Sequence, residues 1–147
     1  MRYDADAIVM CNERIRCLNL SLFGTPVSQQ RPRTRRWNRS FTIFDPSARM
    51  KTMCRSALKD AMHSVGVVNF PFFSSNDRPQ VTVVVDFYVS NLRKDVDNML
   101  KFVLDVMQTI VYRDDSCVFK VVATKIPTAV GFEKTEINIE HVLLDEI

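Results

Sequence analysis

The chain has 147 residues and a mass of 17.0 kDa, the size of a single domain with one hydrophobic core. With 46% hydrophobic and 25% charged residues, and no apolar stretch near the roughly 20 residues that a spanning helix needs, the composition argues against disordered, fibrous and membrane-spanning classes. The net charge of +3 is uneven: residues 14–59 hold eleven lysines and arginines against one acid and carry +10, while the remaining residues carry −7, a separation expected of a polyanion-binding protein with an acidic metal site.

Residues 1–13 lack the basic start, apolar segment and cleavage site of a signal peptide, so we expect a cytoplasmic, nuclear or viral protein. We assign 1–13 to an extension ahead of a domain that spans 14–147. The four cysteines are Cys11, Cys17, Cys54 and Cys117. Because no Cys-x-x-Cys pair or histidine cluster accompanies them, we predict buried free thiols rather than zinc ligands.

The domain is predicted to open with a half-buried strand and a basic loop. Polar and apolar residues alternate over 14–22, and Gly24 follows the strand. The loop at 24–39 holds Arg31, Arg33, Arg35, Arg36 and Arg39. Trp37 lies among them, and guanidinium groups beside an indole suit phosphate contact and stacking on a nucleobase. The alternative is a solvated loop whose Trp37 packs on the core.

A short strand at 41–44 is predicted to lead into an amphipathic helix. Asp45 is expected at its N-cap and Pro46 at its first position. Apolar residues recur at three- and four-residue spacing up to Val65, and Gly66 ends the helix. The opposite face carries Arg49, Lys51, Arg55 and Lys59. We expect this face to extend the basic surface.

Three more strands are predicted in the second half of the chain. Segment 80–90 is rich in β-branched residues and is expected inside the sheet, with Asp86 on a solvated face or near a site. Segments 116–126 and 133–142 form two strands joined by a turn. An aromatic run, Phe70, Phe72 and Phe73, either packs under the sheet or meets a partner. The whole pattern predicts an α+β domain, a small mixed sheet packed with two main helices.

Acidic residues concentrate around the second helix, within 94–116. The predicted helix 96–111 carries Asp97, Lys101, Asp105 and Gln108 on one face. The rest of that helix is almost entirely apolar, so we predict that this polar stripe lines a cleft.

Asp95 and Asp97 lie two residues apart at the start of this helix. If the chain is extended there, both carboxylates project to the same side and need a cation between them. Hard oxygen ligands select Mg²⁺, with Mn²⁺ as a substitute. Asp115 would complete the ligand set, and a metal-bound water would attack a phosphate. Lys101, one turn from Asp97, would neutralise charge in the transition state.

A structural role is the alternative for these residues. Asp95 then caps the helix, Asp97 complements its dipole, and the stripe forms ion pairs one turn apart. An EF-hand is excluded, because Leu100 stands where that loop requires glycine.

The acidic pattern resembles the signature of the RusA family of Holliday-junction resolvases. Its first half is Asp95-Val-Asp97-Asn98 followed by Lys101 and Asp105, and its second half is Val111-Tyr112-x-Asp114-Asp115-Ser116. The arginine-proline segment at 24–33 and the helix after it are similar to the N-terminal half of that family. The resemblance covers about residues 15–142.

The resemblance implies a small homodimeric, Mg²⁺-dependent endonuclease that binds four-way DNA junctions and makes symmetric nicks. It carries metal binding to Asp95, Asp97 and Asp115, and the role of catalytic lysine to Lys101. Asn98 and Asp105 would orient these groups. The basic segment 31–39 would hold DNA.

The chain departs from the family at two positions. It has Gln108 near a usual glycine after the helix, and Cys117 where a glutamine often follows the aspartate pair. A non-catalytic protein that binds branched DNA is the main alternative function. A transferase with a metal-binding Asp-x-Asp motif is disfavoured, because no glycine-rich phosphate loop accompanies the acids. The resemblance places the protein on DNA in a prokaryotic, phage or viral setting.

Overall fold

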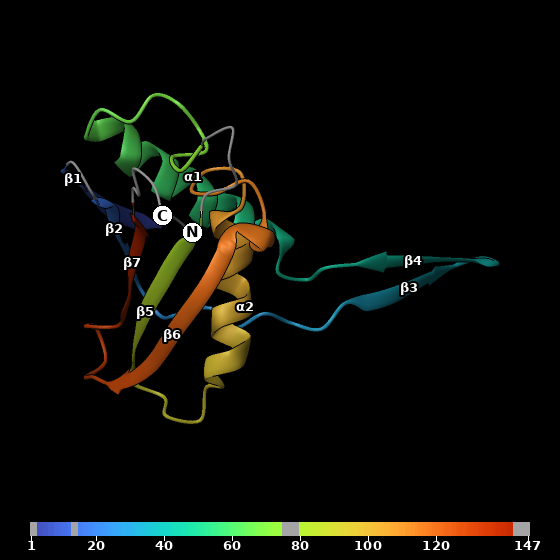
Figure 1. Cartoon of the computed structure of the whole chain (residues 1–147). Coiled ribbons are helices and arrows are strands. Elements are labelled where there is room, and N and C mark those ends of the chain that lie inside the picture. The colour runs from blue at the N-terminus through green and yellow to red at the C-terminus, as the bar shows by residue number, and fades with distance from the viewer. Residues whose placement is uncertain (1–2, 13–14, 75–79, 143–147) are drawn as a thin grey trace.

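The structure is a computed structural model that describes residues 3–12, 15–74 and 80–142. The described strands are β1 (Asp4–Cys11), β2 (Ile15–Phe23), β3 (Arg33–Trp37), β4 (Ser40–Phe44), β5 (Val81–Val89), β6 (Val118–Pro127) and β7 (Lys134–Val142). The helices are α1 (Ala48–Ser64), α2 (Val96–Met107) and a 3₁₀ turn, η1 (Asp115–Cys117). Five strands form a mixed sheet in the order β1-β2-β7-β5-β6, and β3 and β4 form a separate hairpin (Figure 1). The predicted α+β class is confirmed.

Strand β5 lies inside the sheet, as its β-branched sequence predicts. It pairs with β7 on one side and with β6, in parallel, on the other. Its residues alternate between buried and half-buried positions from Val81 to Val89. The parallel pairing requires a crossover between β5 and β6, and α2 lies in that crossover.

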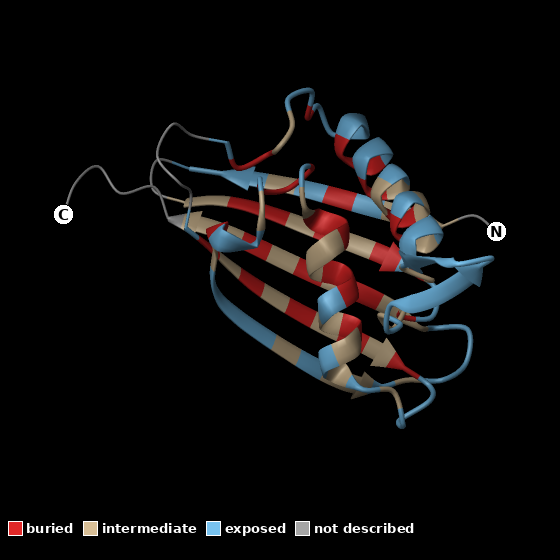
Figure 2. Cartoon of the chain, turned by 90° about the vertical axis from the view of Figure 1, so that its right-hand side faces the viewer, coloured by how far each residue is buried: buried red, intermediate tan, exposed pale blue. Residues whose placement is uncertain are grey.

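Both helices cover the same face of the sheet (Figure 2). The core between the helices and the sheet includes the fully buried side chains Leu18, Leu20, Leu58, Met62, Phe87, Met99 and Phe102. Phe72 and Phe73 are also buried, which settles the open question about this aromatic run in favour of packing. Asp86 is half-buried and alternates with the core residues of β5, so it lies on the sheet face that the helices leave open.

The prediction that residues 1–13 form an extension is wrong for the described part. Residues 4–11 are strand β1, which pairs with β2 along its whole length and contributes Ala7 to the core. The sequence Asp-Ala-Asp-Ala has low strand propensity, so only pairing with β2 makes it a strand.

Two helix boundaries differ from prediction. Helix α1 has Ser47 as N-cap, because Asp45 instead forms a turn in which its Oδ1 accepts a hydrogen bond from the Ser47 N–H at 2.8 Å. Its predicted end is confirmed, with Gly66 at a positive φ of 92°. Helix α2 ends at Met107 rather than at 111. After it, Thr109 has a φ of 73° and the chain turns to bury Tyr112 in the core, where its hydroxyl donates to the Leu104 carbonyl.

The cysteine prediction is confirmed at three positions and wrong at one. Cys17, Cys54 and Cys117 are buried free thiols, whereas Cys11 is exposed on the edge strand β1. Among the described residues, no helix is long and apolar enough to cross a membrane.

Candidate metal and nucleic-acid-binding site

The N-terminus of α2 presents the two predicted aspartates. Asp95 has extended backbone angles, and its Oδ1 accepts a hydrogen bond from the Asp97 N–H at 2.9 Å. Its Oδ2 lies 3.4 Å from the amide nitrogen of Asn98, which donates to it. Asp95 is therefore the helix N-cap, and both side chains stay exposed to solvent.

Lys101 lies one turn further along the same face. Its Nζ is 3.3 Å from Asp97 Oδ2, and the two side chains are 62% and 64% exposed. This end of the polar stripe lies open at the surface rather than deep in a cleft. Such an exposed ion pair contributes little to the stability of the fold. Asp97 and Lys101 can therefore separate at little cost, and each can then contact a ligand.

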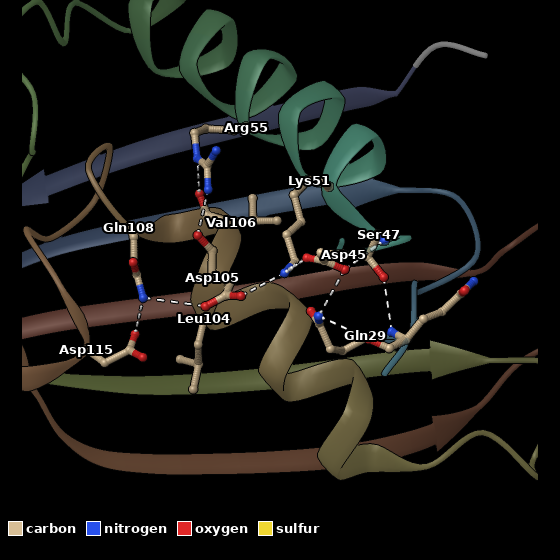
Figure 3. Close-up of polar contacts among 12 residues, drawn as sticks. Gln29, Asp45, Ser47, Lys51, Arg55, Leu104, Asp105, Val106, Gln108 and Asp115 are labelled. Atoms are coloured by element: carbon tan, nitrogen blue, oxygen red, sulfur yellow. Dashed lines mark hydrogen bonds and ion pairs between the residues drawn. The ribbon is translucent and has the colours of Figure 1, made fainter. Parts of the chain in front are cut away.

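Asp105 occupies a different environment from Asp97, although both belong to the stripe. Lys51 of α1 donates to Asp105 Oδ2 at 2.8 Å and to Asp45 Oδ2 at 2.7 Å (Figure 3). Burial would lower the pKa of Lys51, but its hydrogen bonds to Asp105 and Asp45 outweigh burial and raise the pKa. The hydrogen bond from Lys51 in turn lowers the pKa of Asp45.

Asp115 lies at the opposite end of α2 from Asp95 and Asp97. Gln108, just after α2, donates its amide hydrogen to Asp115 Oδ1 at 2.8 Å and also lies 3.5 Å from Asp105 Oδ1. The 12 residues of α2 span about 18 Å at roughly 1.5 Å per residue. The prediction that Asp115 joins the other two aspartates is therefore not met within one chain. In the described part of the chain, no group of three acidic, histidine or cysteine side chains could hold a metal ion.

Asp114, the neighbour of Asp115, is the N-cap of η1. Its Oδ1 accepts from the Ser116 N–H at 2.9 Å and from the Ser116 hydroxyl, and its Oδ2 pairs with Arg113 at 3.1 Å. These hydrogen bonds from Ser116 lower the pKa of Asp114.

The pair formed by Asp95 and Asp97 has the donor chemistry that Mg²⁺ uses. Both are exposed carboxylates, and they lie two residues apart in the first turn of α2, with Asp95 at the N-cap. Mg²⁺ in phosphoryl-transfer sites is commonly held by one or two carboxylates plus substrate phosphates, not by an all-protein cage. Asp95 and Asp97 therefore suit an Mg²⁺ ion of this kind. Asp115 of the same chain lies at the other end of α2 and is not a third ligand.

The basic segment forms an arm that projects away from the body (Figure 1). Strands β3 and β4 pair from Arg33 to Phe44 around a two-residue turn, where Asn38 takes a positive φ of 55°. Every residue of both strands is exposed. Trp37 is 74% exposed, so it does not pack on the core as the alternative required.

Aromatic and basic side chains alternate over both faces of the hairpin. Arg35 lies over the Phe44 ring at 5.4 Å on one face, and Arg36 lies over the Phe41 ring at 5.6 Å on the other. The exposed arginines of the arm and its flanks are Arg31, Arg33, Arg35, Arg36 and Arg39. The arm therefore offers cations for phosphates together with flat surfaces for bases.

The expected basic face of α1 is only partly present. Arg49 and Lys59 are exposed, whereas Lys51 is 8% exposed and pairs with acids. Arg55 turns toward α2 and donates to the carbonyls of Asp105 and Val106 at 2.8 and 3.1 Å. The three- and four-residue spacing of the sequence could not reveal this, because it does not show that α2 packs against that side of α1.

A comparison with protein families identifies one match. The family model described as Endodeoxyribonuclease RusA matches residues 24–140, which include the arm, both helices and every candidate aspartate. No curated protein matches the chain.

Proposed function

The chain belongs to the RusA family of endodeoxyribonucleases, and we propose on this basis that it resolves four-way DNA junctions by Mg²⁺-dependent, paired nicks. It is an endodeoxyribonuclease by membership of the family, and the family implies Holliday-junction resolution in recombination and repair. The observation that carries the finer proposal is the pairing of Asp95 and Asp97 at the exposed start of α2, with Lys101 one turn away.

The residues at the start of α2 have separate roles in this proposal. Asp95 and Asp97 would hold Mg²⁺ together with the scissile phosphate. Once bound, the ion supplies a water nucleophile and stabilises negative charge on the phosphate. Lys101 leaves its ion pair with Asp97 and places its ammonium group against the developing charge. Asn98 keeps Asp95 oriented through its 3.4 Å hydrogen bond.

The arm would hold the DNA backbone while the α2 site cuts it. Its arginines contact phosphates without reading base sequence, so binding is expected to depend strongly on salt. We further propose that the enzyme acts on branched DNA in the cytoplasm of a prokaryotic, phage-infected or virus-infected cell.

A homodimer would supply the second cut and the third carboxylate. An isologous dimer presents two identical sites to a junction with two-fold symmetry. Within one chain Asp115 is about one helix length from Asp97. We propose that Asp115 of the partner subunit completes the site formed by Asp95 and Asp97.

Mixing two inactive variants tests the shared site. Subunits with Asp97→Asn and subunits with Asp115→Asn would each be inactive alone. If the site is shared, a mixed dimer regains one complete site, so the mixture nicks one strand of a junction without making the paired cut. Denaturing gels of junctions with each strand labelled distinguish the two products. A mixture that stays inactive, although mixed dimers are detected by differential tags, would show that Asp115 does not act across the dimer.

The activity itself is tested on a synthetic four-way junction. We expect symmetric nicks in Mg²⁺ and binding without cleavage in Ca²⁺, since Ca²⁺ prefers more ligands and looser geometry. A matched linear duplex is the control and is expected to stay intact. Binding of the junction without nicks in either Mg²⁺ or Mn²⁺ would favour the alternative, a non-catalytic protein that binds branched DNA.

A further inference from the structure

A buried lysine joins the base of the arm to helix α2. The Lys51 side chain is 10% exposed, and its Nζ lies 2.7 Å from Asp45 Oδ2 and 2.8 Å from Asp105 Oδ2. Asp45 directly follows β4, and Asp105 is in the last turns of α2. A buried ammonium group is costly unless it is paired, and here two carboxylates pair it. Lys51 therefore links the segment that follows β4 to the C-terminal part of α2.

On the side of the arm, this contact fixes both segments that connect the hairpin to the body. Asp45 Oδ1 accepts from Ser47 N–H at 2.8 Å and from the Gln29 side-chain amide at 3.4 Å. The Gln29 N–H donates to the Asn98 carbonyl of α2 at 2.9 Å, and the Gln30 N–H donates to Ser47 Oγ at 3.0 Å. The chain is therefore anchored just before β3 and just after β4 (Figure 3).

On the other side, the contact leads to Asp115. The second oxygen of Asp105 lies 3.5 Å from the Gln108 amide nitrogen, and the same nitrogen donates to Asp115 at 2.8 Å. Figure 3 shows these side chains in one continuous series, from Asp45 through Lys51, Asp105 and Gln108 to Asp115.

We propose that Lys51 is a positioning residue that couples the DNA-binding arm to Asp115. The proposal rests on the proposed function, since it assumes that the arm binds DNA and that Asp115 serves the cleavage site. Without Lys51, Asp45 and Asp105 would repel each other as two partly buried carboxylates. Asp45 would then release the base of the arm, and Asp105 would no longer hold Gln108 against Asp115.

The arm carries its own reporter for this coupling. Trp37 is the single tryptophan of the chain and lies at the end of β3, next to the turn of the hairpin. Its fluorescence anisotropy therefore measures the mobility of the arm in the free protein, without metal, DNA or activity.

The test compares three variants of the full-length protein. Lys51→Met removes the ammonium group, and Lys51→Arg keeps a positive charge between the two acids. Arg55→Met is the matched control, because Arg55 ties α1 to α2 through the Asp105 and Val106 carbonyls without contacting Asp45. Each variant is measured for Trp37 anisotropy, for junction affinity in Ca²⁺, and for the single-turnover cleavage rate at saturating junction in Mg²⁺.

Lys51→Met is expected to lower the Trp37 anisotropy and to slow saturated cleavage by about 10- to 100-fold, the range for losing a group that orients a ligand. Junction affinity in Ca²⁺ should change by less than about threefold, because the arginines of the arm are intact. Lys51→Arg should restore both anisotropy and rate, and Arg55→Met should leave the anisotropy at its wild-type value. Should Lys51→Met fail to fold by circular dichroism, Asp45→Asn, at a more exposed position, is expected to lower the anisotropy in the same way.

Two results would overturn the coupling. One is an unchanged anisotropy in the folded Lys51→Met protein or, in its place, in Asp45→Asn. The other is an equal effect of Lys51→Met and Arg55→Met on all three measurements, which would make Lys51 a plain tie between the helices. If the wild-type protein cleaves no branched DNA, the proposed function fails, while the anisotropy still decides whether Lys51 holds the arm.

Discussion

Asp97→Asn is expected to abolish junction cleavage and to leave junction binding intact. Asparagine keeps the size of the side chain and its place in the first turn of α2, but it removes the negative charge that would hold Mg²⁺. A bound metal supplies several kcal/mol of transition-state stabilisation, so its loss slows cleavage by about 100- to 1,000-fold or more. In the proposed function, binding depends instead on the arm, whose strands project away from the body (Figure 1).

The measurement is the single-turnover rate in Mg²⁺ beside the junction affinity in Ca²⁺. Asp60→Asn is a suitable control, because Asp60 is an exposed acid on α1. It should cleave at the wild-type rate. An Asp97→Asn protein that still nicks junctions in Mg²⁺ would show that this carboxylate does not hold the metal.

Changing Arg33 and Arg36 together to glutamine is expected to weaken junction binding and to reduce its salt dependence. Both side chains are exposed on the arm, where no acidic side chain pairs with them among the ion pairs of the described residues. If each contacts one phosphate, the slope of log affinity against log salt falls in magnitude by about 1.8. The loss of affinity between 50 and 200 mM salt then becomes about tenfold smaller than in the wild-type protein.

Titrations of a labelled junction in Ca²⁺ at several salt concentrations give this slope. Lys120→Gln removes an exposed cation from β6, away from the arm, and should leave the slope unchanged. Equal affinity of the double variant and the wild-type protein at both low and high salt would remove the arm from the DNA surface.

Local sequence patterns predicted most of the helices and strands, because the formation of these elements depends mainly on residues that are neighbours in the sequence. The β-branched run of β5 and the apolar spacing of α1 and α2 each specify an element by themselves. The end of α1 at Gly66 followed from the need for a positive φ. Strand β1 did not follow, because the alternating aspartates and alanines of its first half become a strand only through pairing with β2.

The sequence likewise predicted one part of the candidate site and left another part open. The spacing of Asp95, Asp97 and Lys101 determined by itself that these groups share one exposed helix start. It also left open both a metal site and a helix cap, and Asp95 makes the cap in the single chain. A capping carboxylate and a metal ligand need the same residue at the same position, so local sequence does not separate the two roles.

The tertiary structure alone decided where the remaining charged groups lie. Asp115 lies at the opposite end of α2 from the other aspartates, because the parallel crossover returns the chain to the opposite end of the sheet; the helix between them is about 18 Å long. Lys51 appeared to belong to a solvated basic face, and the packing of α1 against α2 instead buries it between Asp45 and Asp105. Periodicity assigns a residue to a face of its own helix, but which faces meet depends on contacts between residues far apart in the chain.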